Sequence, residues 1–234
     1  MKKKMLAFLL SAMCIVGVGS YATMAYYTDS AAKTNVFTFV GKNGLNAVLS
    51  EPNWNANKGI MLLPNEEIPK DPQVTNTSDN NFDELVALKV EFVYTDTCPD
   101  VSKRGKLLSS QDMAYVADVY EIDYNADGNS SPKVWARFNG ESRKSSTQRF
   151  FYTGVLKRNL KTTGKGDTTT PLFTKIKVDK SVNNTRYSHI QDIGGFDIKI
   201  SGHVLQQMTG ETYFGLNSGI DAYNHGLFDF NPEY

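Results

Sequence analysis

The sequence contains little cysteine and little histidine. Its 234 residues include two cysteines, Cys14 and Cys98, and three histidines. Cys14 lies in an apolar N-terminal run with the pattern of a cleaved leader, so Cys98 is expected to be alone in the mature chain. No intramolecular disulfide is then expected, and a chain of this length can fold without one. The sequence predicts that the hydrophobic core alone stabilises the fold.

The known catalytic motifs that are easiest to recognise are also missing. None of His189, His203 and His225 lies in an H-E-x-x-H pattern. The sequence has no G-x-S-x-G nucleophile elbow, no Walker loop and no G-x-G-x-x-G motif. His203 follows Gly202 on a strand pattern, where a structural role is favoured over metal binding. We therefore expect a protein that is not an enzyme.

The chain has no excess of charge of either sign. Lysine and arginine together number 25, and so do aspartate and glutamate. Residues 1–25 carry three lysines and no acid, so their removal leaves 22 basic and 25 acidic residues, a formal charge of −3. This balance gives no electrostatic reason to expect a nucleic acid or an anionic membrane as partner.

The longest apolar run lies at the N-terminus. Lysines at positions 2–4 precede an apolar run at 5–18, and small or weakly polar residues follow. This is the layout of a secretory signal peptide. A retained membrane anchor is the alternative, but a span needs roughly 20 apolar residues and this run is shorter. We expect cleavage between Ala25 and Tyr26, with membrane contact only before cleavage.

Downstream, short runs with a period of two are separated by turns rich in glycine, asparagine, serine and threonine. The ranges with a strand pattern are 36–40, 45–49, 86–94, 119–124, 134–138, 149–156, 172–178 and 196–204. Range 86–94 has apolar residues at alternate positions and Lys89 and Glu91 between them, which predicts a strand buried on one face. Many short strands with turns between them indicate a sandwich or a jelly roll.

Two segments interrupt this strand pattern. Residues 109–117 predict a short helix with Ser109 or Ser110 as its N-cap. Prolines at 64, 69 and 72 exclude a helix in their own segment and disfavour a central strand there.

The turn-rich segment between 119–124 and 134–138 predicts that these two strands form a hairpin. Residues 157–170 and the polar region around 183–184 are expected to be exposed connections without regular structure.

One turn resembles half of a calcium loop. Asp123, Asn125 and Asp127 alternate and Gly128 follows, as in the first half of such a loop. The acid expected at loop position twelve is missing, because Val134 stands there. A plain hairpin turn is favoured, since Asn, Asp and Gly tolerate positive φ. Weak calcium binding at Asp123, Asn125 and Asp127 remains a hypothesis, and no other cofactor is expected.

Several longer motifs carry a resemblance to a known family. They are GVG at 17–19, AYYTDS at 25–30, TNVFT at 34–38, LSEPNW at 49–54, LPNEEIPKDPQVTNT at 63–77, FFYTGVL at 150–156, TPLF at 170–173 and FDIKI at 196–200 with Val204 and Gln206. With these motifs the chain resembles the TasA/camelysin family of secreted bacterial proteins, which are cut by a signal peptidase of the SipW type. Asn65 departs from the family's usual turn glycine, and as asparagine it tolerates a left-handed backbone.

The resemblance implies an all-β fold, a jelly-roll-like antiparallel β-sandwich with short helical insertions. It also implies location in the matrix or on the surface of a Gram-positive-type bacterium, and assembly into fibres. In such fibres the N-terminal segment of one subunit completes a sheet of the next, so the partners are further copies of the chain, the SipW-type peptidase and other matrix proteins. The residues expected in this assembly strand are Tyr26, Tyr27, Val36, Phe37, Thr38, Phe39 and Val40.

These expectations divide the chain into a signal peptide at 1–25, an N-terminal strand at 26–40, a β-sandwich domain at 41–206 and a tail at 207–234 packed on or near the domain. Three alternatives remain open. The strand at 36–40 could pair within its own domain, or the protein could be a monomeric surface adhesin. The camelysin branch of the family carries a metallopeptidase label, which the residues do not favour because no zinc-binding pattern is present.

Overall fold

The computed structural model describes residues 37–40, 46–54, 65–77, 83–126, 135–158, 166–179 and 184–207, together with Gly219 and Phe228. Its strands are β1 (Phe37–Val40), β2 (Asn46–Ser50), β3 (Glu67–Pro69), β4 (Gln73–Asn76), β5 (Asp83–Tyr94), β6 (Tyr120–Ile122), β7 (Trp135–Arg137), β8 (Thr147–Tyr152), β9 (Lys175–Val178) and β10 (Phe196–Gln207). Its helices are α2 (Ser110–Val119) and α3 (Asn184–Asp192). The described chain is mostly β, which confirms the expected class at this level.

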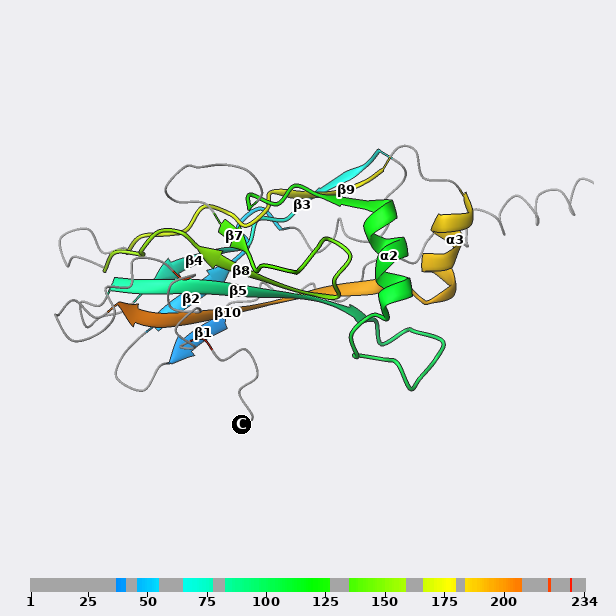
Figure 1. The fold of residues 1–234 in the computed structure, drawn as a ribbon, viewed down its shortest axis with the longest axis horizontal. Coiled ribbons are helices and arrows are strands. Elements are labelled where there is room, and N and C mark those ends of the chain that lie inside the picture. Colours follow the sequence, from blue (N-terminus) through cyan, green and yellow to red (C-terminus); the bar gives the residue numbers. More distant parts are fainter. Residues whose placement is uncertain are drawn as a thin grey trace, which may run out of the picture.

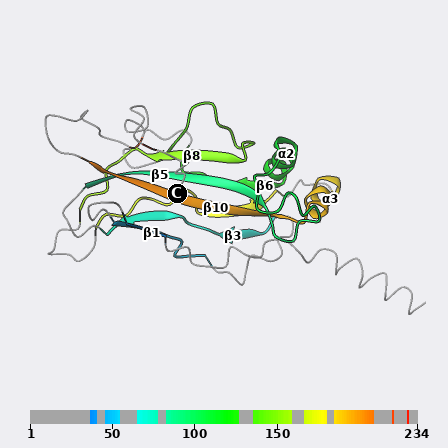
Figure 2. The ribbon, with the colours of Figure 1, turned by 90° about the horizontal axis from the view of Figure 1, so that it is seen from below.

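The strands form three sheets in which every pairing is antiparallel. Their orders are β1-β2-β4, β10-β5-β8-β7 and β3-β9-β6. The longest ladder joins β5 to β10, from Asp83 opposite Gln207 to Tyr94 opposite Phe196. Figure 1 shows these two strands running along the length of the molecule, and Figure 2 shows β5 and β8 on one side with β1 and β3 on the other.

One hydrophobic core is shared by the three sheets. Ala47, Leu49 and Val74 from the first sheet join residues of β5, β8 and β10 and of the β3-β9-β6 sheet in a single buried cluster. Every second residue of these strands faces the core, as the period of two predicts.

The expectation that β5 is buried on one face only is wrong for its first half. Leu85 and Ala87 point away from the main core, yet both are fully buried. They pack with Phe151 of β8 and with Phe228 of the C-terminal tail, whose ring centroid lies 6.1 Å from that of Phe151. A second buried cluster, which includes tail residue Phe228, therefore covers this face.

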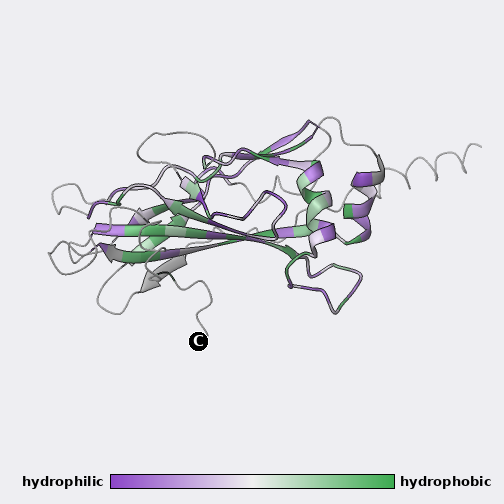
Figure 3. Cartoon of the chain, viewed as in Figure 1, coloured by the Kyte–Doolittle hydropathy of each residue, from purple (hydrophilic) through white to green (hydrophobic). Residues whose placement is uncertain are grey.

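The two helices lie side by side at one end of the sheets (Figures 1 and 2). The predicted helix is confirmed as α2, and Ser109 is its N-cap, because the Ser109 side chain accepts a hydrogen bond from the Asp112 backbone N–H. The prediction missed α3, which occupies the segment around Asn184 expected to be a loop. Figure 3 shows that α3 carries mainly hydrophilic residues, so no clear apolar period marks it in the sequence.

Two predicted connections are also corrected. Residues 119–124 and 134–138 do not form a hairpin, because β6 pairs with β9 and β7 pairs with β8 in another sheet. The described part of the 157–170 connection is not simply exposed, since Thr169 is 3% exposed and its backbone N–H donates to Val74 O. Long-range pairing overrides the local turn signals in both places.

Asn65 confirms the expectation made for it. Its φ is 72°, the left-handed region in which asparagine replaces glycine at small cost. No helix among the described residues has the length and apolarity needed to cross a membrane.

Candidate functional site

The expected assembly strand lies at the edge of a sheet. β1 pairs with β2 in an antiparallel ladder, with Phe37 opposite Leu49 and Phe39 opposite Ala47. Both β2 residues are buried, with at most 1% of their surface exposed. Within the described part of the chain no strand pairs with the other side of β1. The backbone of β1 is therefore held along one side only, by hydrogen bonds to β2.

The opposite edge of the same sheet is covered. β4 bonds on its far side to residues 167–169, through Asn76 N to Asp167 O at 3.0 Å and Thr169 N to Val74 O at 2.8 Å. Gly166 allows this approach, because a Cβ there would lie 2.2 Å from the Asn76 carbonyl oxygen. In the described chain the open edge of this sheet is thus on the β1 side.

The neighbouring strand β3 has an edge protected by proline. Lys70 N donates to Thr174 O on the side of β9, so the alternating neighbour Pro69 directs its nitrogen to the other side. That nitrogen carries no hydrogen and cannot donate to an added strand. Prolines of this kind discourage unwanted pairing at sheet edges. β1 contains no proline, so the open edge of its sheet carries no such block.

Two of the motifs that carry the family resemblance meet next to β2. Lys70 Nζ lies 2.8 Å from Oε1 and 2.8 Å from Oε2 of Glu51, and both side chains are only 3% exposed. The same ammonium group lies 4.4 Å from the ring centroid of Trp54. Asn53 donates to Asp71 from its backbone at 2.9 Å and from its side-chain amide at 2.7 Å. Sequence reasoning missed this cluster, because charged residues beside prolines normally predict an exposed segment.

A second polar cluster joins the two helices to β5. The carboxylate of Asp112 accepts hydrogen bonds from the hydroxyl groups of Tyr94 and Ser109 on one oxygen. Its other oxygen lies 2.8 Å from His189 Nε2. The His189 ring stacks on Tyr115, with centroids 4.0 Å apart. These contacts connect α3 to α2 and surround the N-cap of α2.

The pKa of Asp112 is lowered in the folded protein. Burial raises it, but hydrogen bonds from Ser109, Tyr94 and His189 and the positive charge of Lys103 together outweigh burial.

The cluster contains the residue types of a Ser–His–Asp triad in a different order. In a triad the imidazole lies between hydroxyl and carboxylate and takes the proton of the nucleophile. Here the carboxylate lies between them, so His189 does not activate Ser109.

The carboxylate of Asp123, the first of the calcium candidates, is engaged in protein contacts. Asp123 Oδ1 accepts the backbone N–H groups of Thr174 at 2.8 Å and Lys175 at 2.9 Å, and the Thr174 hydroxyl donates to its other oxygen. Asn125 donates its backbone N–H to Leu172 O at 2.7 Å. Asp127 lies outside the described residues. Among the described side chains, no group of three or more His, Cys, Asp or Glu is placed to hold a metal ion.

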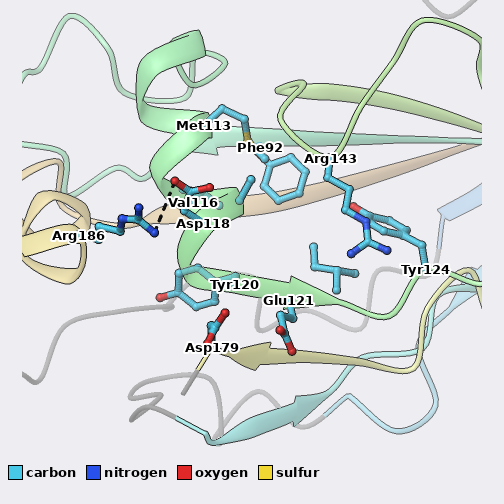
Figure 4. Close-up of a pocket in the computed structure, with 12 residues that line it drawn as sticks. Phe92, Met113, Val116, Asp118, Tyr120, Glu121, Tyr124, Arg143, Asp179 and Arg186 are labelled. Atoms are coloured by element: carbon cyan, nitrogen blue, oxygen red, sulfur yellow. Dashed lines mark ion pairs between the residues drawn. The ribbon is translucent and has the colours of Figure 1, made fainter. Parts of the chain in front are cut away.

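A cavity of about 350 Å³ lies beside α2 and β6 (Figure 4). Its buried apolar side is formed by Phe92, Met113, Val116 and Ile122, and its more exposed side carries Asp118, Glu121, Arg143, Asp179 and Arg186. Arg186 Nη1 lies 3.8 Å from Asp118 Oδ2, and Lys144 Nζ lies 3.2 Å from Asp118 Oδ1. A concave surface with apolar and charged parts is suited to a small polar ligand.

The remaining sequence candidates fall in two groups. Ala25, Tyr26, Tyr27 and Val36 lie outside the described residues, as does most of the tail. Cys98 is described and buried, with 2% of its surface exposed and no disulfide.

Comparisons with models of protein families, with curated proteins and with solved structures found no match.

Proposed function

We propose that this protein is a secreted structural protein of the biofilm matrix or cell surface, which polymerises when its N-terminal strand is donated to the next subunit. The observation that carries the proposal is the position of β1, a four-residue edge strand with β2 as its one pairing partner in the described chain. We further infer that the domain is a jelly-roll-like antiparallel β-sandwich, since the three sheets share a single core.

Donation requires no new type of contact. A β1 strand from a neighbour can make the same four pairs with β2 that β1 makes within its own chain. The segment 41–45 that connects β1 to β2 includes Gly41 and Gly44, and glycine permits many backbone conformations. Exchange of an identical element between copies is a low-cost route to association. When a copy gives its strand to one neighbour and receives a strand from another, the contact is head-to-tail and propagates as a filament, whereas reciprocal exchange between two copies would give a closed dimer.

The resemblance to the TasA/camelysin family supports the same proposal. The LSEPNW and LPNEEIPKDPQVTNT motifs, on which this resemblance partly depends, meet at the Glu51–Lys70 pair. Cleavage after Ala25 by a SipW-type peptidase would free the strand from the membrane, so that assembly follows export. Further copies of the chain are the main partners, and other matrix proteins are additional ones.

A mixture of two single-cysteine chains tests strand donation directly. In a Cys98→Ser background, one mature chain (residues 26–234) carries Thr38→Cys and the other carries Val48→Cys. Positions 38 and 48 are opposite each other in the ladder. Opposite Cα atoms in such a ladder are about 4.5 to 5.5 Å apart, within the range that a disulfide bridges. A disulfide between the two different chains can form in this register only when β1 of one copy pairs with β2 of another.

We expect a covalent heterodimer under mild oxidation, and filaments of the unmodified chain by negative-stain electron microscopy. Ser50→Cys in place of Val48→Cys is the matched control, because it lies two residues out of register with Thr38. Heterodimer formation equal to that control would contradict donation. A double Thr38→Cys/Val48→Cys chain that closes only internal disulfides would establish that β1 stays in its own domain.

The cavity beside α2 favours a second candidate function, a monomeric surface-binding module. Its apolar and charged sides could hold a saccharide or another small polar group of a cell-surface polymer. Saturable binding to cell-wall polysaccharide by a chain that stays monomeric, lost in Arg186→Ala and kept in Lys175→Ala, would support it. Absence of saturable binding would remove this candidate.

A further inference from the structure

Polar contacts join the residues after β2 to the residues before β4, with Glu51, Lys70 and Asp71 buried and Asn53 exposed. We call Glu51, Asn53, Trp54, Lys70 and Asp71 the polar latch. Glu51 follows the last residue of β2, and Lys70 and Asp71 lie between β3 and β4. Two sets of bonds therefore cross from the end of β2 to the segment that precedes its partner strand.

The apolar pattern of β2 does not by itself exclude a shift by two residues. β2 pairs with β4 through four residue pairs, and its buried residues are Ala47 and Leu49. Leu45 continues the same alternation in the sequence. A shift of β2 by two residues would therefore keep apolar residues on the core face, unlike a shift by one.

The polar latch does not tolerate such a shift. Two residues of strand correspond to about 6.6 Å, so the 2.8 Å contacts between Glu51 and Lys70 would be lost. Both side chains are 3% exposed, so the shift would leave buried charges without partners. That outcome is strongly unfavourable. The directional bonds of Asn53 to Asp71 would break in the same movement.

We propose that the polar latch fixes the register of β2, and so keeps β2 in place as an acceptor edge when its own β1 has been donated. The proposal rests on the proposed function. Its physical basis is that the described polar contacts of the latch join the end of β2 to the segment before β4 without a residue of β1, so these contacts can persist while the β1 side of β2 is empty.

Hydrogen exchange of the β2 amides in the mature chain tests this role. Phe39→Pro weakens β1 in all samples, because proline removes a ladder donor. In this background we compare the intact latch with Asn53→Ala and with Glu51→Met/Lys70→Met, which leaves no unpaired charge. The matched control is Glu67→Met/Lys175→Met, which removes an exposed Lys–Glu pair at 3.0 Å.

We expect protection of the amides of Val48 and Ser50, which face β4, to fall by about ten- to a hundredfold in both latch variants, the range for loss of one charge-assisted hydrogen bond. Protection in the middle of β5 and in the matched control should not change. Equal protection of β2 with and without the latch would overturn the proposal. If the double variant does not fold, the protection of the β2 amides in Asn53→Ala alone tests the proposal.

Failure of the latch and failure of strand donation are distinguishable. The mixed-cysteine heterodimer of the parent chain reports donation, whereas β2 exchange reports the latch. A parent that forms the heterodimer, with β2 protection unaffected by the latch variants, overturns only the latch. The opposite result is that the parent chain forms no heterodimer while the latch variants still lose β2 protection. In that case the latch fixes the register of β2 but has no role in assembly.

Discussion

Removal of the Lys70 ammonium group should be far more harmful than removal of a surface lysine. In Lys70→Met the Glu51 carboxylate keeps its place at 3% exposure and loses a cation that contacts both of its oxygens at 2.8 Å. The ammonium contact with the Trp54 ring at 4.4 Å is lost as well. Breaking a buried ion pair from one side costs about 3–5 kcal/mol, because the remaining charge is buried alone.

The double variant Glu51→Met/Lys70→Met should regain most of this stability. It has no buried charge, and apolar replacements of buried pairs are often neutral or stabilising. Lys175→Met is the control, since Lys175 and Glu67 are 44% and 55% exposed and exposed pairs of this kind contribute little to stability.

Urea unfolding of the mature chain followed by tryptophan fluorescence measures all three variants, with Trp54 and Trp135 as the reporters. A loss of about 3–5 kcal/mol in Lys70→Met corresponds to a fall in Tm of roughly 6–20 °C for a domain of this size. A Lys70→Met chain as stable as Lys175→Met would contradict the expected cost of the unpaired carboxylate, and so would a double variant less stable than Lys70→Met.

Three further outcomes follow from the described contacts. Because the pKa of Asp112 is lowered in the fold from the ordinary 3.8, its stabilising contribution is present above that pH and is lost as the pH falls through the lower folded pKa. Acid unfolding should therefore be less steep in Asp112→Asn than in the parent, with the two stability curves converging at low pH. Gly166→Ala should destabilise the chain by about 1–3 kcal/mol in urea unfolding, since its Cβ would lie 2.2 Å from the Asn76 carbonyl oxygen. Millimolar calcium should leave Tm unchanged, because both oxygens of Asp123 already accept hydrogen bonds, and a rise in Tm that Asp123→Asn abolishes would contradict this.

Local signals predicted most of the individual elements. The period of two located β2, β5 and β10, because side chains on successive strand residues face opposite sides, and runs of strand-forming residues located β1 and β8. Ser109 marked the start of α2 through its capping hydroxyl, and Asn65 marked a left-handed turn. Each of these signals depends on the residue itself and its immediate neighbours.

The pairing of elements was not predictable in the same way. The turn-rich segment between β6 and β7 favoured a hairpin, but β6 pairs with β9 and β7 with β8. The burial of the second face of β5 depends in part on Phe228, which is far away in the sequence. Non-local partners decided both features, and a single sequence carries no local mark of them.

The candidate site shows the same division. The sequence by itself determined that residues 37–40 form a strand, because β-branched and aromatic residues fit a pleated surface. It did not determine that this strand is an edge strand paired with β2. It also did not determine that Glu51 and Lys70, 19 residues apart, would be buried together next to the end of β2. Only the tertiary structure decides such matters, because the free energy of a buried charge depends on the partner that the fold places next to it.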